Sequence, residues 1–299
     1  MTLVPYDDRD GWIWSDGKLI PWREAKMHVC THALHYASCV FEGERVYDGT
    51  AFKLREHTDR LLHSARILGF EIPYSADDID RACREVIDAQ KLKDGYLRPV
   101  AWRGSEQMGV SAQQSRIHLA IASWEWPAYF TPEARLQGIR MQISKWRRPA
   151  PDTAPTDSKA AGLYMICTLS KHKAEADGYN DALMFDYRGR VAEATGANIF
   201  FVKDGEIHTP IADCFLNGIT RRTVIELAKK RQYRVHERAI MPSELPGFDE
   251  VFLSGTAVEV TPVRQIDSMT YQVSDVTKTL LADFDKLVRE KSPTTRAAE

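Results

Sequence analysis

Membrane, nucleic-acid and secretory signals are all missing from this chain of 299 residues. No apolar run approaches the roughly 20 residues that a membrane-spanning helix requires. No long basic run accompanies the formal net charge of -2, which argues against a nucleic-acid partner. The opening stretch, MTLVPYDDRDGWIW, is acidic and polar. It has neither the basic region nor the apolar region of a secretory signal peptide, so none is expected.

Cysteine is scarce, and its spacing fits neither a metal site nor a disulfide framework. The five cysteines form no CxxC pair and no zinc-binding pattern: Cys30, Cys39, Cys83, Cys167 and Cys214. A chain of this length buries about three quarters of its unfolded surface and needs no disulfide for stability. We therefore expect reduced thiols, a cytoplasmic location and no bound metal.

Glycine-rich nucleotide loops are missing too, since no GxGxxG or P-loop motif follows a predicted strand. The composition, 43% hydrophobic and 27% charged, is that of a soluble globular protein. Helix-like and strand-like segments are mixed through both halves without a regular βαβ rhythm. This mixture favours an α+β fold over a doubly wound sheet.

The residue pattern predicts where the main elements lie. Hairpin turns are expected at SDG and YDGT, and Ser75 is expected to cap a helix. Pro99 predicts an edge strand or a bulge. A helix is expected in TRRTVIELAKKR, and a strand, a turn and a strand in EVFLSGTAVEVTPV. Strands are further predicted at 96–102, 117–123, 182–187 and 198–202, and helices at 57–69 and about 159–177.

Lys159 is the first candidate for chemistry, because it stands among small and apolar residues in PTDSKAAGLYM. Burial lowers the pKa of a lysine, and a neutral amine can form a Schiff base with a carbonyl. The alternative is a lysine whose stem packs while its ammonium reaches water.

Glu193 is the second candidate, because it lies between alanines in GRVAEATGANIFF. A buried carboxylate needs a partner, and a protonated pyridine nitrogen would be one. The alternative is a structural carboxylate that Thr195 or Asn198 satisfies.

Anion sites are expected where loops leave backbone N–H groups free. Gly218, Ile219 and Thr220 precede a predicted helix, whose N-terminus attracts anions. The stretch from Gly255 to Ala257 offers a second set of N–H groups. Arg60 lies on a predicted helix in REHTDRLLHSARIL. An ordinary helix cap and a surface arginine are the alternatives.

Together these groups are the protein parts that pyridoxal phosphate requires: a Schiff-base lysine, a carboxylate for the ring nitrogen, and phosphate donors. The sequence resembles the fold-type IV pyridoxal-phosphate aminotransferases, most closely the branched-chain amino acid aminotransferases. The resemblance runs from about residue 28 to 264 in several long blocks, including THALHYASCVFEGERVYDG, REHTDRLLHSARI, YLRPV, SKAAGLY, VAEATGANIFFVKDGEIHTP, NGITRRTVIELAK and DEVFLSGTAVEVTPV.

The resemblance implies a role for each candidate. Lys159 would form the Schiff base and move the substrate proton, Glu193 would hold the pyridinium proton, and Tyr164 would bond the phenolic oxygen. The phosphate would be held by Arg60, Ile219, Thr220 and Thr256, the middle two through backbone N–H groups.

The implied fold is a two-domain α+β fold of the D-amino acid aminotransferase type, with the cofactor between the domains. The small N-terminal domain would span 1–123, an interdomain loop 124–135, and the large C-terminal domain 136–290. The tail, 291–299, is expected to be disordered. Such proteins are at least homodimers, and part of each pocket comes from the neighbouring subunit.

The strand YLRPV carries the prediction of substrate. Residues i and i+2 of a strand share a face, so Tyr96 and Arg98 could bind one carboxylate, joined by the N–H groups at Thr256 and Ala257. The resemblance assigns this pair to enzymes that transfer the amino group of L-leucine, L-isoleucine or L-valine to 2-oxoglutarate. The side-chain pocket would be lined by Tyr36, Phe41, Trp126, Tyr129, Tyr164 and Val110, of which Tyr36 and Val110 would come from the partner subunit. Core packing is the alternative for each aromatic residue.

Three positions depart from the family pattern: Glu44 in FEGER, Leu163 in KAAGLY and Asn217 in LNGIT. None of them removes a catalytic group. Other functions remain open, namely an (R)-amine or D-amino acid transaminase, an aminodeoxychorismate lyase, or a non-catalytic protein that binds the cofactor. Arg98 beside Tyr96 argues against the first three, and the joint presence of Lys159 and Glu193 argues against the last.

Overall fold

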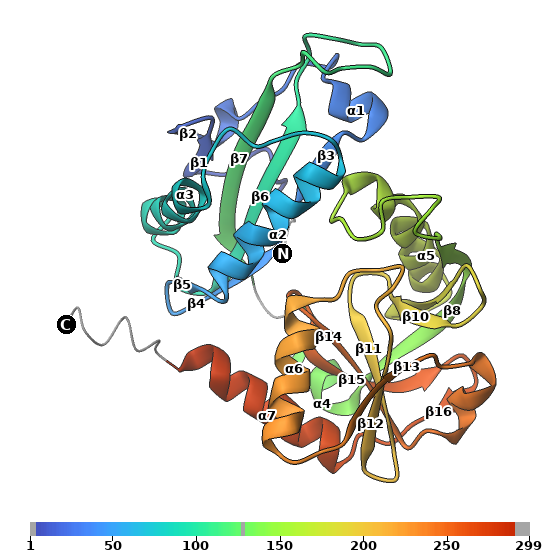
Figure 1. Ribbon diagram of the computed structural model, residues 1–299. Helices are drawn as coiled ribbons and strands as arrows, with labels where there is room; N and C mark the ends of the chain where they lie inside the picture. The colour runs from blue at the N-terminus through green and yellow to red at the C-terminus, as the bar shows by residue number, and fades with distance from the viewer. Residues whose placement is uncertain (1–3, 127–128, 291–299) are drawn as a thin grey trace. The chain divides into compact units, whose positions relative to one another are not determined.

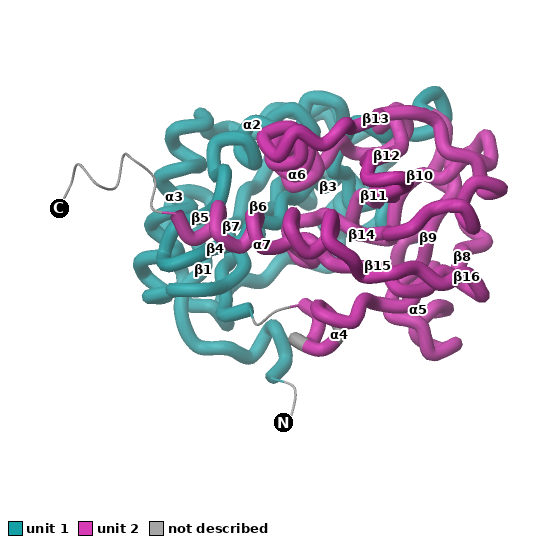
Figure 2. Tube along the Cα trace, turned by 90° about the horizontal axis from the view of Figure 1, so that it is seen from below, with its two compact units in different colours: residues 1–127, 151–165 teal, residues 128–150, 166–299 magenta. Residues whose placement is uncertain are grey.

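The computed structural model describes residues 4–126 and 129–290 (Figure 1). The chain divides into two compact units, which comprise residues 1–127 with 151–165 and residues 128–150 with 166–299 (Figure 2). The domain boundaries expected from the sequence stay a prediction, and the tail that was expected to be disordered lies outside the described residues. Helices and strands are mixed in both units, as the α+β prediction requires.

The first unit is built on a sheet with the strand order β2-β1-β7-β6-β4-β5, in which β3 also pairs with β6. Its strands are β1 (Trp12–Ser15), β2 (Lys18–Pro21), β3 (Cys39–Phe41), β4 (Glu44–Tyr47), β5 (Thr50–Ala51), β6 (Gly95–Arg103) and β7 (Ile117–Glu125). Its helices are η1 (Trp22–Glu24), α1 (His32–Tyr36), α2 (Leu54–Ile67), α3 (Ala76–Ala89) and η2 (Ala161–Tyr164).

Two-residue turns close the expected hairpins. Asp16 and Gly17 connect β1 to β2 with φ of 46° and 102°, and Asp48 and Gly49 connect β4 to β5 with φ of 48° and 78°. Positive φ at both turn residues matches the right-handed twist of a hairpin, and Asp-Gly tolerates it. Both predicted hairpins are confirmed.

Pro99 does not lie in an edge strand, because β6 pairs with β7 along its whole length. On its other side β6 meets β3 and β4, and Pro99 faces the gap between them at Glu42 and Gly43. The Glu42 N–H donates to the Pro99 carbonyl at 2.9 Å. The missing N–H of proline therefore falls where the ladder is already interrupted, which is the irregularity that the sequence allowed as the alternative to an edge.

The helices α2 and α3 pack on each other and contribute apolar side chains to the core of the first unit. Helix α2 begins at Leu54, earlier than predicted, and Gly69 follows its end with a φ of 72°. Ser75 caps α3 as expected, in a capping box with Asp78.

Residues 151–165 belong to the first unit, although the sequence placed them in the C-terminal domain. The backbone explains this position: Ala160 forms a β-bridge with Val40, and the Phe41 N–H donates to the Lys159 carbonyl at 3.2 Å. The helix expected from about 159 is therefore wrong at its start. Lys159 is extended, η2 follows it, and α5 (Met165–Ala176) begins only after η2.

The second unit contains a sheet with the order β10-β9-β8-β15-β14-β11-β12-β13. Strand β10 also pairs with β11, so the path of paired strands from β10 to β11 closes on itself. The strands are β8 (Ile139–Arg148), β9 (Asp181–Asp186), β10 (Val191–Ala194), β11 (Asn198–Lys203), β12 (Glu206–Pro210), β13 (Val235–Arg238), β14 (Glu250–Gly255), β15 (Glu259–Ile266) and β16 (Met269–Thr270).

Helices α6 (Ile219–Lys230) and α7 (Asp275–Arg289) pack side by side against β14, as Figure 1 shows in orange and red. Leu280, Phe284 and Val288 form the buried face of α7. The remaining helices of this unit are α4 (Pro132–Gln137), α5 and η3 (Pro242–Gly247). The predicted helix in TRRTVIELAKKR and the strand pair around Gly255 are confirmed.

Glu44 is a buried acid inside the first unit, and it gives a stability prediction. Its side chain is fully buried in β4, and neither carboxyl oxygen bonds to any other described group. Burial, then Glu42 and Asp80, raise its pKa well above the ordinary value. An unsatisfied buried polar group costs about 1–3 kcal/mol, so Glu44→Leu should raise the free energy of unfolding by that amount near neutral pH.

The effect of Glu44→Leu should depend on pH. The folded protein keeps the Glu44 proton at pH values where the unfolded chain has lost it, so the contribution of Glu44 to stability falls as pH rises above its unfolded pKa. The gap in melting temperature between variant and parent should therefore widen from about pH 5 to about pH 8. Glu85→Leu, at an exposed position of α3, is the matched control. An equal gap at both pH values would contradict the prediction.

Candidate active site

Lys159 is fixed at its backbone by two elements of the first unit. Its N–H donates to Ser64 Oγ of α2 at 2.9 Å, and its carbonyl accepts from Phe41 at the end of β3. The sequence favours this extended backbone locally, because Ser158 bonds back to Pro155 and ends the preceding turn. The Lys159 side chain therefore leaves the backbone from a defined position.

The amine of Lys159 lies beside two aromatic rings, those of Phe41 and Tyr164. Its Nζ donates to Tyr164 Oη at 2.8 Å and lies 5.0 Å from the centre of the Phe41 ring. Burial, then the charge of Arg60, lower the pKa of Lys159 to about 8. The amine is therefore much closer to its neutral, nucleophilic form than an exposed lysine. Of the two interpretations, this setting favours the reactive lysine over one whose ammonium reaches water.

Arg60 is held in place by the buried carboxylate of Glu42. Its Nε and Nη2 donate to Glu42 Oε1 and Oε2 at 2.6 and 2.8 Å. His57, one turn earlier on α2, lies 2.7 Å from Glu42 Oε2 through Nδ1. Burial opposes ionisation of Glu42, but Arg60 and His57 outweigh it and lower its pKa. Arg60 is thus a largely buried, fixed cation and not a plain surface arginine.

Tyr96 and Arg98 share one face of β6, as the strand period predicts. Arg98 Nη2 donates to Tyr96 Oη at 3.4 Å, and the guanidinium lies 4.7 Å from the centre of the Phe41 ring. Arg98 Nε is buried and bonds to no other described group, so it is open to a carboxylate. Gly43 allows this arrangement, because an added Cβ there would clash with Tyr96 Oη.

The aromatic candidates fall into separate groups. Trp126 packs on Tyr96 with ring centres 5.1 Å apart, and Phe41 meets Tyr164 at 4.9 Å. These residues therefore belong to the group around Lys159 in the first unit. Tyr129 belongs to the second unit, where it is exposed and Lys171 Nζ lies 5.4 Å from its ring.

Tyr36 and Val110 lie in a third place within the first unit. Both are exposed, 45% for Tyr36 and 84% for Val110. His32 connects them, because its ring stacks on Tyr36 at 4.6 Å and its Nε2 lies 3.0 Å from the carbonyl of Gly109. The structure thus brings these two candidates to one surface but not to the group around Lys159.

Glu193 lies in β10 of the second unit, where both of its oxygens have partners. Oε1 lies 3.3 Å from Arg148 Nε, and Oε2 accepts from Asn198 Nδ2 at 3.3 Å. Thr195, the other partner considered, donates to Asp181 instead. A carboxylate oxygen can accept more than one hydrogen bond, so Glu193 retains capacity for a further N–H donor.

Asn198 connects Glu193 to the start of α6. Its amide also donates to the Leu216 carbonyl at 3.1 Å, and its Oδ1 accepts from the Gly218 N–H at 3.2 Å. A side chain at Gly218 would clash with Asn198. The N–H groups that follow, at Ile219 and Thr220, belong to the first turn of the helix and have no partner within it. Ile219 and Thr220 therefore have a fixed position relative to Glu193.

Thr256 and Ala257 lie in the turn after β14, and both are half-buried. Strand β14 pairs with β11, and Ser254 stands opposite Asn198 in that pairing. Thr256 therefore lies two residues after the position of β14 that pairs with Asn198.

Asn217, a departure from the family pattern, accepts from Arg221 Nη1 at 2.9 Å. Leu163, another departure, is a buried residue of η2.

Sequence reasoning missed Glu42, His57 and Arg148. A signal existed for Glu42 and His57, because an acid beside Gly43 and a histidine one turn before Arg60 fall in the matched blocks. Arg148 ends β8, far from Glu193 in the chain, and only the parallel pairing of β8 with β9 brings it near. No local pattern could have found it.

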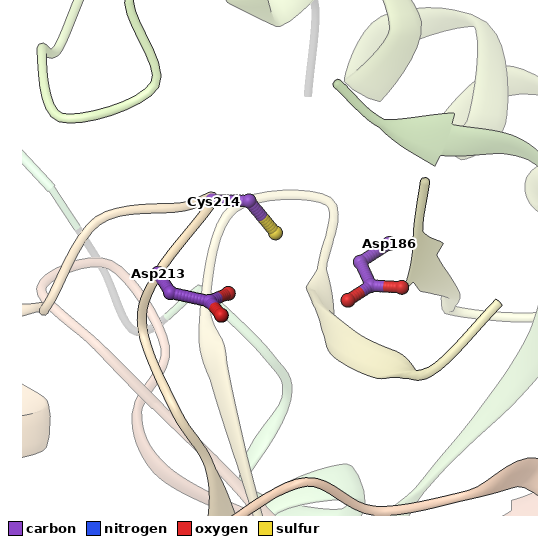
Figure 3. A group of neighbouring side chains, drawn as sticks. All are labelled: Asp186, Asp213 and Cys214. Atoms are coloured by element: carbon purple, nitrogen blue, oxygen red, sulfur yellow. The ribbon is translucent and has the colours of Figure 1, made fainter. Parts of the chain in front are cut away.

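Another cluster of polar side chains lies in the second unit. Asp186, Asp213 and Cys214 hold potential ligand atoms within 4.8 Å of one another, and Figure 3 shows both carboxylates and the thiol turned inward. Arg188 already donates to Asp186 Oδ2 and Asp213 Oδ1, at 2.8 and 2.7 Å. Burial, then the charge of Asp186, raise the pKa of Cys214 to about 12. A thiol and an ion-paired pair of carboxylates give no reason to infer a metal.

The first unit thus offers a lysine with a lowered pKa, a fixed arginine and a second arginine whose Nε is open. The second unit offers a carboxylate joined to a helix N-terminus. This set is suited to an enzyme that works through pyridoxal phosphate, which needs a reactive amine, anion donors and a carboxylate for its ring nitrogen. Among the described residues, no helix is long and apolar enough to cross a membrane.

The chain belongs to the class IV aminotransferase family, whose model matches residues 39–266. It is 45% identical to the branched-chain-amino-acid aminotransferase of Pseudomonas aeruginosa, over 87% of this chain and 86% of that protein. It is 41% identical to a probable branched-chain-amino-acid aminotransferase of Rickettsia felis, over 97% of this chain and 100% of that one.

Solved structures agree with the family. The branched-chain amino acid aminotransferase of Escherichia coli superposes with a TM-score of 0.91 at 38% identity, covering 95% of this chain and 97% of that chain. The branched-chain amino acid aminotransferase of Thermobaculum terrenum, crystallised with its pyridoxal phosphate, gives a TM-score of 0.86 at 29% identity, covering 94% of this chain and 95% of that chain. The expected fold, the two-domain fold of type IV enzymes, is confirmed.

Proposed function

We propose that this protein catalyses pyridoxal-phosphate-dependent transamination between branched-chain L-amino acids and 2-oxoglutarate, giving branched-chain 2-oxo acids and L-glutamate. The observation that carries the proposal is the 45% identity to the Pseudomonas aeruginosa enzyme over most of both chains. The carboxylate-binding pair of Tyr96 and Arg98 supports the same substrate class.

The residues divide the work of holding the cofactor and moving a proton. Pyridoxal phosphate supplies a reactive carbonyl and a ring that accepts electron density from the substrate. Lys159, with its lowered pKa, would move a proton between the substrate Cα and the C4′ carbon of the cofactor. Tyr164, which accepts from Lys159 Nζ, would also bond the phenolic oxygen of the cofactor, while Glu193 would keep the ring nitrogen protonated. Arg60, Thr256 and the N–H groups of Ile219 and Thr220 would bind the phosphate.

An amino-donor panel tests the proposed function. L-leucine, L-isoleucine and L-valine should transfer their amino groups to 2-oxoglutarate, whereas D-alanine and an (R)-amine should not. Absorbance of the bound cofactor, followed in the same samples, shows whether each donor reacts with the enzyme. Preference for the (R)-amine or D-alanine would favour another type IV transaminase and would reject the proposed substrate class.

Arg98 should serve every substrate, because each carries an α-carboxylate. A lost charge-assisted hydrogen bond costs about 1.5–3 kcal/mol, or roughly ten- to a hundredfold in rate. Arg98→Ala should therefore lower kcat/KM for L-leucine and L-glutamate by similar factors. Arg103→Ala, at the end of the same strand, is a control whose guanidinium bonds Gly69 and Ala112 instead. Intact leucine kinetics in Arg98→Ala would contradict the carboxylate assignment.

Tyr36 and Tyr129 should distinguish the two kinds of side chain that the enzyme accepts. An apolar tail needs only aromatic walls, but the γ-carboxylate of 2-oxoglutarate needs donors. A tyrosine hydroxyl supplies a donor while its ring still faces an aliphatic chain. Tyr36→Phe and Tyr129→Phe should therefore lower kcat/KM for L-glutamate and leave that for L-leucine nearly unchanged. Equal losses for both amino acids would contradict this role.

We also infer a homodimer or larger oligomer in which the partner subunit contributes to each site. The exposed apolar surface on α1 and the loop of residues 104–116, with Tyr36 and Val110, supports this arrangement. Val110→Asp should shift the mass measured by light scattering toward that of a monomer and reduce turnover. A wild-type protein that is monomeric yet active would reject the shared site.

The proposed location is the cytoplasm. All five cysteines are free thiols, which fits a reducing compartment. Cell fractionation with an antibody against the chain tests this proposal.

A further inference from the structure

The carboxylate of Glu42 stands at the centre of a buried group in the first unit. Its side chain is completely buried, and it joins β3 to α2 through Arg60 and His57. Because an ionised carboxylate only accepts hydrogen bonds, His57 must carry its proton on Nδ1. Burial lowers the pKa of His57, although Glu42 opposes this shift. His57 is therefore a neutral donor, and Arg60 is the cation that balances Glu42.

The geometry leaves part of Arg60 available. Glu42 engages Nε and Nη2 in a two-point contact, at 2.6 and 2.8 Å, which fixes the plane of the guanidinium. The remaining N–H groups, on Nη1 and the outer side of Nη2, can still donate. An arginine whose guanidinium is held along one edge presents its other edge in a constant orientation. A flexible arginine would lose side-chain entropy when it bound a ligand, and this arginine has already lost it.

The histidine adds a second restraint on the carboxylate itself. His57 and Arg60 lie on the same face of α2, one turn apart, and both contact Glu42 Oε2. The N–H of Gly43 also donates to this oxygen, at 3.3 Å. Glu42 cannot rotate without losing all three contacts. A purely structural link between β3 and α2 would not need these three contacts, because the backbone of Lys159 already connects α2 and β3.

We propose that Glu42, held by His57, is a positioning residue that presents Arg60 to the phosphate group of the cofactor. The proposal rests on the function proposed above and assigns its phosphate site a support that the family role of Arg60 does not include. Glu42 touches neither substrate nor cofactor in this role. It acts through Arg60 alone, so its removal should weaken the binding of a phosphate and spare contacts to the ring.

A comparison of two ligands tests the proposal without relying on turnover. Apoprotein is titrated with pyridoxal phosphate and with pyridoxal, which lacks the phosphate. In Glu42→Gln, affinity for pyridoxal phosphate should fall roughly ten- to a hundredfold, the range for a lost charge-assisted contact, while affinity for pyridoxal should change little. Inorganic phosphate should also compete less well with pyridoxal phosphate in this variant. Glu42→Asp should recover part of the loss.

Two further variants make the result decisive. Asp157→Asn removes an exposed carboxylate that pairs with His63, a residue of the helix α2 that also carries Arg60. This variant should leave the affinities for both ligands unchanged. His57→Asn removes one restraint on Glu42 and should produce a smaller loss for pyridoxal phosphate alone. It replaces Glu42→Gln in the comparison if that variant fails to fold. Equal losses of both ligands in a folded variant would overturn the proposal and leave Glu42 a structural tie.

The outcome is separable from that of the proposed function. If the donor panel shows another substrate class but the phosphate preference still depends on Glu42, the positioning role stands. If branched-chain transamination is found and Glu42→Gln retains the phosphate preference of the parent, the positioning role fails alone.

Discussion

Lys159→Ala should abolish transamination and still bind pyridoxal phosphate. General acid–base catalysis typically contributes about 10²- to 10⁴-fold, so kcat should fall by at least about a hundredfold. The proposed contacts to the phosphate do not depend on this side chain, because Glu42, and not Lys159, holds Arg60 in place. Leucine turnover and equilibrium dialysis of the cofactor measure the two properties separately. Lys173→Ala, which removes an exposed partner of Asp177, is the matched control and should keep full activity.

The identity of the lysine can be checked directly. Borohydride reduction of the loaded enzyme, followed by peptide mapping, should label Lys159, and a label on another lysine would contradict the assignment. The pKa of Lys159, lowered to about 8, gives a second check on apoprotein. Its neutral fraction rises as pH increases through this value, so acetylation by a neutral reagent should accelerate there. An exposed lysine should respond only near its ordinary pKa of about 10.4.

The fold was most predictable where a local rule acts alone. The Asp-Gly turns and the cap at Ser75 depend on neighbouring residues, and each was found in its expected place. Boundaries were less predictable because distant partners set them. Lys159 looked like the start of a helix, but its β-bridge neighbour Ala160 and the contact with Phe41 hold the backbone extended.

Pro99 shows the same limit for strands. The rule that proline avoids a central strand is sound, yet β6 is central, and the rule is met by an interruption in the neighbouring strands at Glu42 and Gly43. That interruption also brings Glu42 to Arg60. A sequence pattern cannot indicate which strand will break opposite a proline.

The members of the group around Lys159 were predictable from the sequence, but the contacts that hold the candidate residues in place were not. Lys159, Arg60, Tyr96 and Arg98 were chosen from residue type and matched blocks, and the structure brings them into one group. The contacts that hold the candidate residues of the second unit could not be predicted in this way. Arg148 reaches Glu193 only through the pairing of β8 and β9, and Asn198 reaches Gly218 across a loop. Such contacts depend on sheet topology, which a single sequence does not reveal.

Glu193→Gln is the most direct test of the second half of the site, because it removes a charge and keeps the shape of the side chain. A carboxylate beside a ring nitrogen favours the protonated nitrogen, and an amide does not. Loss of one preorganised electrostatic group typically costs roughly a hundred- to a thousandfold in rate. Turnover should fall by that factor, while cofactor affinity should change less than about tenfold, since the proposed phosphate contacts do not involve Glu193.

The partners of Glu193 decide how this result is understood. Arg148 and Asn198 each contact one carboxylate oxygen at 3.3 Å. In Glu193→Gln the amide oxygen can accept from only one of them, so some loss of stability is expected in addition to the electronic effect. A melting curve of each apoprotein measures that part. Glu206→Gln, which changes a half-buried carboxylate paired with Arg234 and His236, is the control and should retain turnover. If Glu193→Gln melts earlier but turns over at the parent rate, Glu193 only holds Arg148 and Asn198 in place, and the ring nitrogen must be held by another group. If turnover falls while the melting curve is unchanged, the charge of Glu193 itself, and not its structural contacts, is needed for a fast reaction.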